Sequence, residues 1–211
     1  MTSRGDGTRV RKAPAERRNE IVAAAARVGL TEGLECITLR QVAGELGVRP
    51  GLVGHYFPVA EELVAEAFTS ATMAELDALL PTLTEQGDGI ALRTLGDFLA
   101  YMSGPEFDNV SKLWLNARHL SRYSPPLHVQ VVSQELLWCR RVEQLIVAGV
   151  REGSFRCDDP WAAAVRVMVA VDGTSAYVNT SIRQRAEPIA EMVRAITEAE
   201  LGLPSGALRS D

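Results

Sequence analysis

Apolar residues recur along this chain at the three- and four-residue spacing of an α-helix. In the first such stretch, Ile21, Val22, Ala25 and Val28 fall on one helical face. Proline precedes or begins many of these stretches, where its missing N–H costs no hydrogen bond and its fixed φ suits the first turn. The pattern predicts nine helices, over residues 15–32, 39–46, 50–57, 58–80, 89–103, 105–123, 125–152, 159–182 and 188–201.

One segment, residues 165–171, alternates apolar residues with others and would also suit a β-strand. It lies inside an unbroken run from Trp161 to Ile182, which is too long for a typical strand. We therefore expect an all-α protein. Its predicted parts are a disordered basic arm, a small three-helix domain, a larger helical bundle and a flexible tail, over residues 1–13, 14–60, 61–202 and 203–211.

The segment from Cys36 to Phe57 has the pattern of a helix-turn-helix. Thr38 and Gln41 are spaced as a capping box that starts a helix at residue 39. Gly47 supplies a residue that tolerates positive φ at the end of that helix. Pro50 then begins a second short helix, which in such a motif enters the major groove of DNA.

The overall charge argues against a nucleic-acid partner until it is divided along the chain. The 211 residues carry a net charge of −5, and the composition is that of an ordinary globular protein. Residues 1–57, however, hold nine basic and six acidic side chains, a net charge of +3, which leaves −8 for residues 58–211. A basic front that contains the helix-turn-helix favours a DNA-facing end.

Several other classes of function find no support in the sequence. The three cysteines and three histidines show no metal-ligand spacing, so we expect no metal and no cofactor. The chain lacks the phosphate-binding glycine loops and the nucleophile motifs of common enzymes, so we predict that it is not an enzyme. No apolar run approaches the ~18 residues of a membrane helix. We expect a reduced, cytoplasmic protein without a membrane partner.

Residues 17–63 resemble the DNA-binding domain of TetR-type (tetracycline repressor-like) transcriptional regulators. The matching positions are Arg18, Ile21, Ala24-Ala25, Glu32-Gly33, Ile37-Thr38, Val42-Ala43, Gly47-Val48, His55-Tyr56-Phe57-Pro58 and Glu61-Glu62-Leu63. The remainder is most similar to the ligand-binding half of the BetI-like subgroup. That likeness involves Trp114, Arg151–Phe155, Asp158–Trp161 and Val171–Gly173.

The resemblance implies a homodimeric regulator, most simply a repressor, that binds a palindromic DNA operator and is released by a small-molecule effector. The residues expected to contact DNA are Arg40, Arg49, Pro50, Gly51, Leu52, Gly54, His55 and Tyr56. The family often has Ser, Thr and Lys where this chain has Arg49, Leu52 and Ala60. These departures leave an alternative open, a helical ligand-binding or protein-interaction module with weak or lost DNA binding.

The larger bundle is expected to hold the effector. The candidate ligand-binding residues are Phe98, Met102, Trp114, Ala117, Arg118, Trp138, Met168, Asp172 and Tyr177, although any one aromatic residue in this set would also suit a core position. They suggest a lipophilic effector that is cationic or forms hydrogen bonds. Asp172 interrupts an apolar helix and would serve either the pocket or the dimer interface. The homodimer is expected to form through the helices near 159–182 and 188–201, where small residues allow close helix packing.

Overall fold

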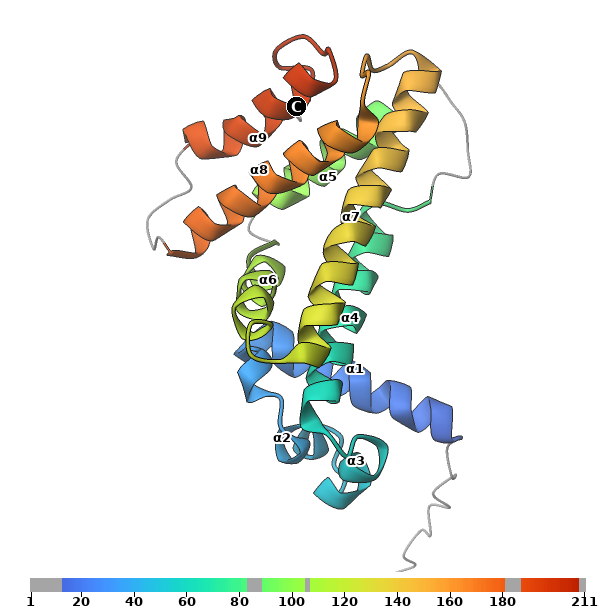
Figure 1. Ribbon diagram of the computed structural model, residues 1–211, viewed down its shortest axis with the longest axis vertical. Helices are drawn as coiled ribbons and strands as arrows, with labels where there is room; N and C mark the ends of the chain where they lie inside the picture. Colours follow the sequence, from blue (N-terminus) through green and yellow to red (C-terminus); the bar gives the residue numbers. More distant parts are fainter. Residues whose placement is uncertain (1–12, 83–88, 105–106, 181–186, 209–211) are drawn as a thin grey trace, which may run out of the picture.

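The computed structural model describes residues 13–82, 89–104, 107–180 and 187–208 (Figure 1). Within these ranges the chain forms nine α-helices and one short 3-10 helix, and contains no β-strand. The helices are α1 (Pro14–Glu32), η1 (Leu34–Cys36), α2 (Leu39–Glu45), α3 (Pro50–Tyr56), α4 (Ala60–Leu79), α5 (Ile90–Ser103), α6 (Asp108–Leu120), α7 (Pro125–Glu152), α8 (Pro160–Thr180) and α9 (Glu187–Glu200). The predicted all-α fold is confirmed, and residues 165–171 are helical inside α8.

Most helix ends lie within one or two residues of the predicted positions, and those of α7 match at both ends. The predicted start at Pro58 is early, because the extended backbone of Val59 precedes the first helical residue, Ala60. The helix predicted over 105–123 is also shorter, since α6 covers only 108–120 and a turn follows it. Pro105 itself lies outside the described residues.

A small apolar core joins α1 to α2 and α3. Ile21, Val42 and Val53 have no exposed surface, and Phe57 is buried at the end of α3. The guanidinium of Arg18 lies 4.6 Å from the centre of the Phe57 ring and forms an ion pair with Glu66 of α4. The three-helix unit is thereby attached to the first long helix of the bundle.

The larger bundle is built on the long helices α4 and α7 (Figure 1). Helices α5, α8 and α9 lie around the end of this pair that is far from α2 and α3, and α6 lies between them and α1. A buried hydrogen bond of 3.1 Å links the hydroxyl of Thr72 on α4 to the side-chain carbonyl of Gln134 on α7. Aromatic rings continue the core, because Trp114 packs edge-on against both Phe68 and Trp138. The bundle therefore has one continuous interior that also faces the three-helix unit.

The end of the chain folds back onto α9. Glu198 accepts hydrogen bonds of 3.0 Å from the backbone N–H groups of Gly206 and Leu208, and Leu208 is buried. The prediction of a flexible tail over 203–211 is therefore wrong for residues 203–208, because a single carboxylate organises their turns. Residues 209–211 and residues 1–12 of the predicted arm lie outside the described residues.

Candidate functional site

The helix-turn-helix is present at the end of the molecule opposite α8 and α9 (Figure 1). The Thr38 hydroxyl accepts a hydrogen bond from the backbone N–H of Gln41, which starts α2. Gly47 then takes a φ of +61°, and the N–H of Val48 bonds to the carbonyl of Ala43 at 2.9 Å. The second half of the expected capping box differs, because the Gln41 side chain donates to Glu32 on α1.

The eight residues predicted to contact DNA form one open surface around α3. Arg40, Arg49, Pro50, Gly51 and His55 are exposed, whereas Leu52, Gly54 and Tyr56 are partly buried. The buried residue of this helix is Val53, which faces the core with Phe57 beside it. The five exposed residues are therefore accessible to a partner, whereas Tyr56 also packs against the core.

Two properties of this surface suit a polyanion. Within the described part of the chain, Arg40 and Arg49 form no ion pair, so both guanidinium groups are available. Gly51 has no atom within 4 Å of the position that a Cβ would occupy. Packing inside the protein thus gives no reason for glycine there, whereas close approach of the α3 backbone to a partner does.

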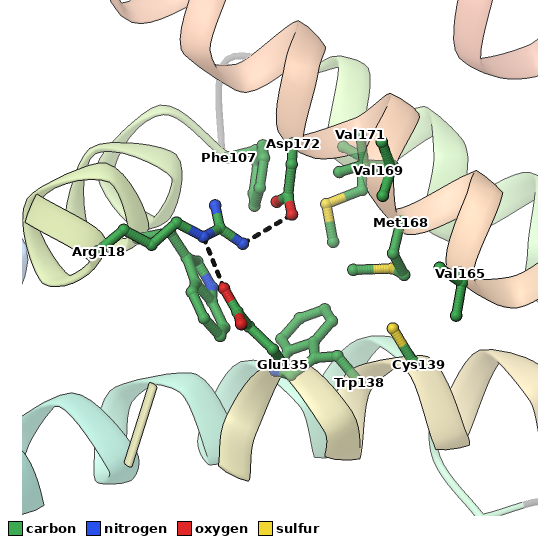
Figure 2. Close-up of a pocket in the computed structure, with 12 residues that line it drawn as sticks. Phe107, Arg118, Glu135, Trp138, Cys139, Val165, Met168, Val169, Val171 and Asp172 are labelled. Carbon is green, nitrogen blue, oxygen red and sulfur yellow. Dashed lines mark hydrogen bonds and ion pairs between the residues drawn. The ribbon is translucent and has the colours of Figure 1, made fainter. Parts of the chain in front are cut away.

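A second candidate site is a cavity of about 240 Å³ between α6, α7 and α8 (Figure 2). Its apolar and aromatic walls are interrupted by one charged group of residues. The lining residues are Met102, Phe107, Trp114, Arg118, Glu135, Trp138, Cys139, Val165, Met168, Val169, Val171 and Asp172. A largely apolar cavity with a few convergent polar groups is typical of a small-molecule site.

Arg118, Glu135 and Asp172, which we call the Arg118 cluster, join three helices across this cavity. Arg118 Nη2 lies 2.6 Å from Asp172 Oδ2, and Arg118 Nε lies 2.8 Å from Glu135 Oε1. The guanidinium carbon is 5.0 Å from the centre of the Trp114 ring. Arg118 is therefore held by a carboxylate of α7, a carboxylate of α8 and an aromatic face of its own helix (Figure 2).

For Asp172, burial has a larger effect on the pKa than the ion pair with Arg118 does. The pKa of Asp172 is raised because desolvation of its carboxylate outweighs the attraction of Arg118. Desolvation also raises the pKa of the Cys139 thiol, and the negative charges of Asp172 and Glu135 add to that rise. The thiol thus keeps its proton at neutral pH, which makes it a poor nucleophile.

The cavity includes six of the nine residues predicted to bind a ligand: Met102, Trp114, Arg118, Trp138, Met168 and Asp172. Phe98 and Ala117 do not line it, because both are fully buried in the core. Tyr177 does not line it either, since its side chain is 68% exposed on the outer face of α8. These three residues do not line this cavity, and their contact with a ligand stays a prediction.

Sequence reasoning missed Phe107, Glu135, Cys139, Val165, Val169 and Val171. Glu135 is the most consequential omission, because it provides half of the negative charge of the Arg118 cluster. On the sequence it is one of several polar residues on α7, and only the approach of α6 gives it a partner. The three valines carried a signal, since they belong to the apolar run around Asp172.

Helix α6 connects the cavity with the helix-turn-helix. Trp114 and Arg118 face the cavity, while Asn116 Oδ1 accepts a hydrogen bond of 2.8 Å from the backbone N–H of Leu34 in η1. Leu113 of the same helix lies near Gly29 of α1, 3.5 Å from the position of a Cβ on that glycine. A displacement of α6 would therefore reach the helix-turn-helix unit directly.

Apolar side chains remain uncovered on the outer faces of α8 and α9. The exposed fractions are 68% for Tyr177 and 43% for Met192. A further exposed apolar stripe, with Val129, Val132 and Leu136, runs along α7 at helical spacing. Large exposed apolar residues that gather on one face are typical of an interaction surface.

Comparison with solved structures places this architecture among transcriptional regulators. A regulator from Saccharomonospora viridis in complex with choline has a TM-score of 0.72 and 20% sequence identity, over 89% of this chain and 98% of that one. A TetR-family regulator from Rhodococcus sp. has a TM-score of 0.71 and 22% identity, over 89% and 99%. This chain has the TetR-type fold. E. coli NemR in its reduced form gives a TM-score of 0.69 at 18% identity, over 89% and 98%.

The likeness to these TetR-type structures is one of fold, because the identities are low. No protein-family model matches the sequence, and no curated protein matches it either. The predicted arrangement of an N-terminal helix-turn-helix followed by a helical bundle is confirmed. The likeness to the BetI-like subgroup stays a prediction.

Neither a membrane-spanning helix nor a metal-binding group of side chains occurs in the described ranges. No helix in the described ranges has the length and apolar character needed to cross a membrane. In the same ranges, no group of three or more His, Cys, Asp or Glu side chains is placed to hold a metal ion.

Proposed function

We propose that this protein is a ligand-responsive transcriptional regulator that binds a palindromic DNA operator as a homodimer. The observation that carries the proposal is the open surface of α3, where Arg49, Gly51 and His55 are exposed on a helix-turn-helix. The TetR-type fold supports it, since the solved structures with this fold include transcriptional regulators.

In this proposal α3 lies in the major groove and its N-terminal residues read base edges. Arg49, at the N-cap of α3, is the candidate for a bidentate contact to guanine. Arg40 on α2 and His55 at the end of α3 suit phosphate oxygens on either side of the groove. Gly51 lets the backbone approach the DNA without a side chain between them.

The homodimer is proposed to form through α8 and α9. Tyr177 and Met192 supply apolar surface that a second copy would cover. A two-fold axis through this surface would present two copies of α3 on the same side, as a palindromic operator with half-sites ~34–36 Å apart requires.

The effector is proposed to bind in the cavity and to favour a conformer with the two α3 helices wrongly spaced for the operator. The S. viridis regulator in complex with choline supports this step, because it shows that a protein of this fold binds a small organic molecule. An effector acts only through a difference in its affinity for the two conformers. Binding would then release the DNA, which is the behaviour of a repressor.

A direct test is a mobility-shift titration with the DNA that flanks the protein's own gene. We expect saturable binding that weakens as salt rises, because phosphate contacts release counterions. The double variant Arg49→Ala and His55→Ala should lose this binding and keep its oligomeric state. Arg151→Ala removes an exposed arginine at the far end of α7 and serves as the matched control. Absence of saturable binding at low salt would contradict the proposal.

A further inference from the structure

The Arg118 cluster already has the composition of a binding site for an organic cation. Carboxylates from α7 and α8 and the face of Trp114 surround the guanidinium of Arg118 at 2.8 Å, 2.6 Å and 5.0 Å. Carboxylates and aromatic faces are the groups with which proteins hold ammonium and guanidinium ions. In this structure the chain's own side chain occupies that environment.

The charges of the cluster do not balance. Glu135 and Asp172 bring two negative charges and Arg118 brings one positive charge, and no other charged side chain lines the cavity among the described residues. The second oxygen of each carboxylate, Glu135 Oε2 and Asp172 Oδ1, accepts no hydrogen bond within the described part of the chain. Both side chains remain 38–40% exposed beside the cavity. One negative charge and two acceptor oxygens are thus left over.

Burial and charge together raise pKa values at this site. The pKa of Asp172 is raised by burial, which the attraction of Arg118 only partly offsets. The pKa of the Cys139 thiol is raised first by burial and then by Asp172 and Glu135, so the negative potential extends across the cavity. A bound cation would lower both pKa values, whereas a bound anion would raise them further.

The cavity is also small and mainly apolar. Its volume of about 240 Å³ is below the roughly 300–1,000 Å³ of sites for drug-sized ligands. Phe107, Trp138 and Met168 lie around the space next to the Arg118 cluster (Figure 2). A ligand that fits must therefore be compact, with an apolar body and a single charged end.

We propose that the effector is a small monovalent organic cation that binds beside Arg118. Its charged group contacts Asp172 Oδ1 and Glu135 Oε2, and its apolar body packs on Phe107, Trp138 and Met168. One positive charge then completes the balance of the cluster. This inference rests on the proposed function in naming the ligand an effector, but binding to the cavity is independent of DNA.

The test uses three soluble probes of nearly equal shape that differ in charge: cyclohexylmethylamine in its protonated form, cyclohexylmethanol and cyclohexanecarboxylate. Calorimetric titration of the full chain at pH 7 measures each dissociation constant. The ammonium should bind roughly tenfold more tightly than the alcohol, because it gains charge-assisted hydrogen bonds, and the carboxylate should bind most weakly. If the alcohol binds as well as the ammonium, or the carboxylate binds best, the proposal is wrong.

Variants locate the site within the chain. Asp172→Asn and Glu135→Gln should each weaken ammonium binding roughly tenfold and leave the alcohol unchanged. Asp77→Asn removes a carboxylate from an exposed ion pair on α4 and should change neither. Arg118→Met should bind the ammonium at least as tightly as the wild type, since two carboxylates remain without an internal cation. Loss of ammonium binding in Arg118→Met, with a folded far-ultraviolet circular dichroism spectrum, would overturn the proposed geometry.

The DNA titration separates this inference from the proposed function. Ammonium binding without any operator binding would keep the cation site and reject the regulator. Operator binding that the ammonium does not weaken, with no calorimetric signal, would reject the cation site and keep the regulator.

Discussion

Single residues on α3 show a conflict between stability and a binding surface. Glycine within a helix costs up to about 1 kcal/mol relative to alanine, and α3 contains two glycines in seven residues. At Gly51 the structure offers space for a methyl group. The residue is thus unfavourable for folding and tolerable only if another requirement, such as contact with DNA, applies.

We expect Gly51→Ala to raise the free energy of unfolding by up to about 1 kcal/mol while weakening operator binding. The added methyl group would fit the protein but stand between the α3 backbone and the DNA. Denaturant unfolding and DNA titration measure the two effects. Gly96→Ala on α5 is the matched control, because its Cβ would also meet nothing within 4 Å. It should stabilise the protein without changing DNA affinity, and an equal loss in both variants would contradict the interpretation.

Glu75 on α4 is a second residue at which burial opposes charge. Its side chain accepts a hydrogen bond of 3.0 Å from the hydroxyl of Tyr101, and its other oxygen, Oε2, is buried without a partner within the described residues. Burial raises the pKa of this carboxyl from 4.5 to about 7. The native protein thus holds a proton that the unfolded chain releases near pH 4.5.

This shift predicts that stability falls as the pH rises from about 4.5 to about 7. Between these values the native state binds more protons than the unfolded state, so the free energy of unfolding decreases with pH, by roughly 3 kcal/mol in total. Glu75→Gln removes the titrating group and should flatten this part of the profile. Asp77→Asn on the same helix should not. Urea unfolding at pH 5, 6, 7 and 8 provides the measurement, and an unchanged slope in Glu75→Gln would rule out this origin.

At the scale of elements, α6 does most to connect the two candidate sites. It places Arg118 in the cavity and Asn116 against η1, two residues apart and therefore on different faces of the helix. Leu34 is buried, so its backbone N–H depends on Asn116 for a hydrogen bond. This single contact ties the position of α6 to that of the helix-turn-helix unit.

We expect Asn116→Ala to lower the free energy of unfolding by about 1–3 kcal/mol, because it leaves the buried N–H of Leu34 unpaired. The same change should reduce the effect of an effector on DNA affinity, since α6 loses a contact with η1. Asn116→Asp keeps an acceptor oxygen, so it should retain most of the stability and most of the effect of the effector on DNA affinity. Thermal unfolding and DNA titration with and without the ammonium probe measure the two effects. If the ammonium probe changed the DNA affinity of Asn116→Ala as much as that of the wild type, other contacts would connect the cavity with the helix-turn-helix.

Most of the helices could be predicted from the sequence. The helices follow from local spacing, and Gly47 takes the positive φ that its position in the motif predicts. The cavity was harder to predict from the sequence, because the residues that line it are far apart in the chain. Tyr177 and Val169 illustrate the difficulty, since both are apolar positions on α8, yet only Val169 lines the cavity. Helical rotation relative to neighbouring helices decides which one does so.

At the scale of the whole molecule, two exposed apolar surfaces could form the interface of the proposed homodimer. The proposed interface on α8 and α9 would cover Tyr177 and Met192. The exposed stripe of α7, with Val129 and Leu136, offers a competing surface. The two surfaces lie on different helices, so substitutions on each can tell the two arrangements apart.

We expect Met192→Glu combined with Tyr177→Glu to convert the proposed dimer to monomer, because charge would be buried in an apolar interface. Operator affinity should fall with it, since a monomer binds one half-site. Val129→Glu on α7 should leave the dimer intact. Sedimentation velocity at several protein concentrations measures the oligomeric state of each variant. If Val129→Glu alone produced monomer, the interface would lie on α7.

The sequence by itself determined the helices, the helix-turn-helix and the division of charge, +3 in residues 1–57 and −8 beyond, because these depend on local spacing and on composition. Tertiary structure alone decided that Glu135 meets Arg118, that Phe98 and Ala117 belong to the core, and that Glu198 organises residues 203–208. The physical reason is that a helical pattern reports which face of a helix is apolar. It does not report which other helix that face meets, and buried charges and cavities are properties of such meetings.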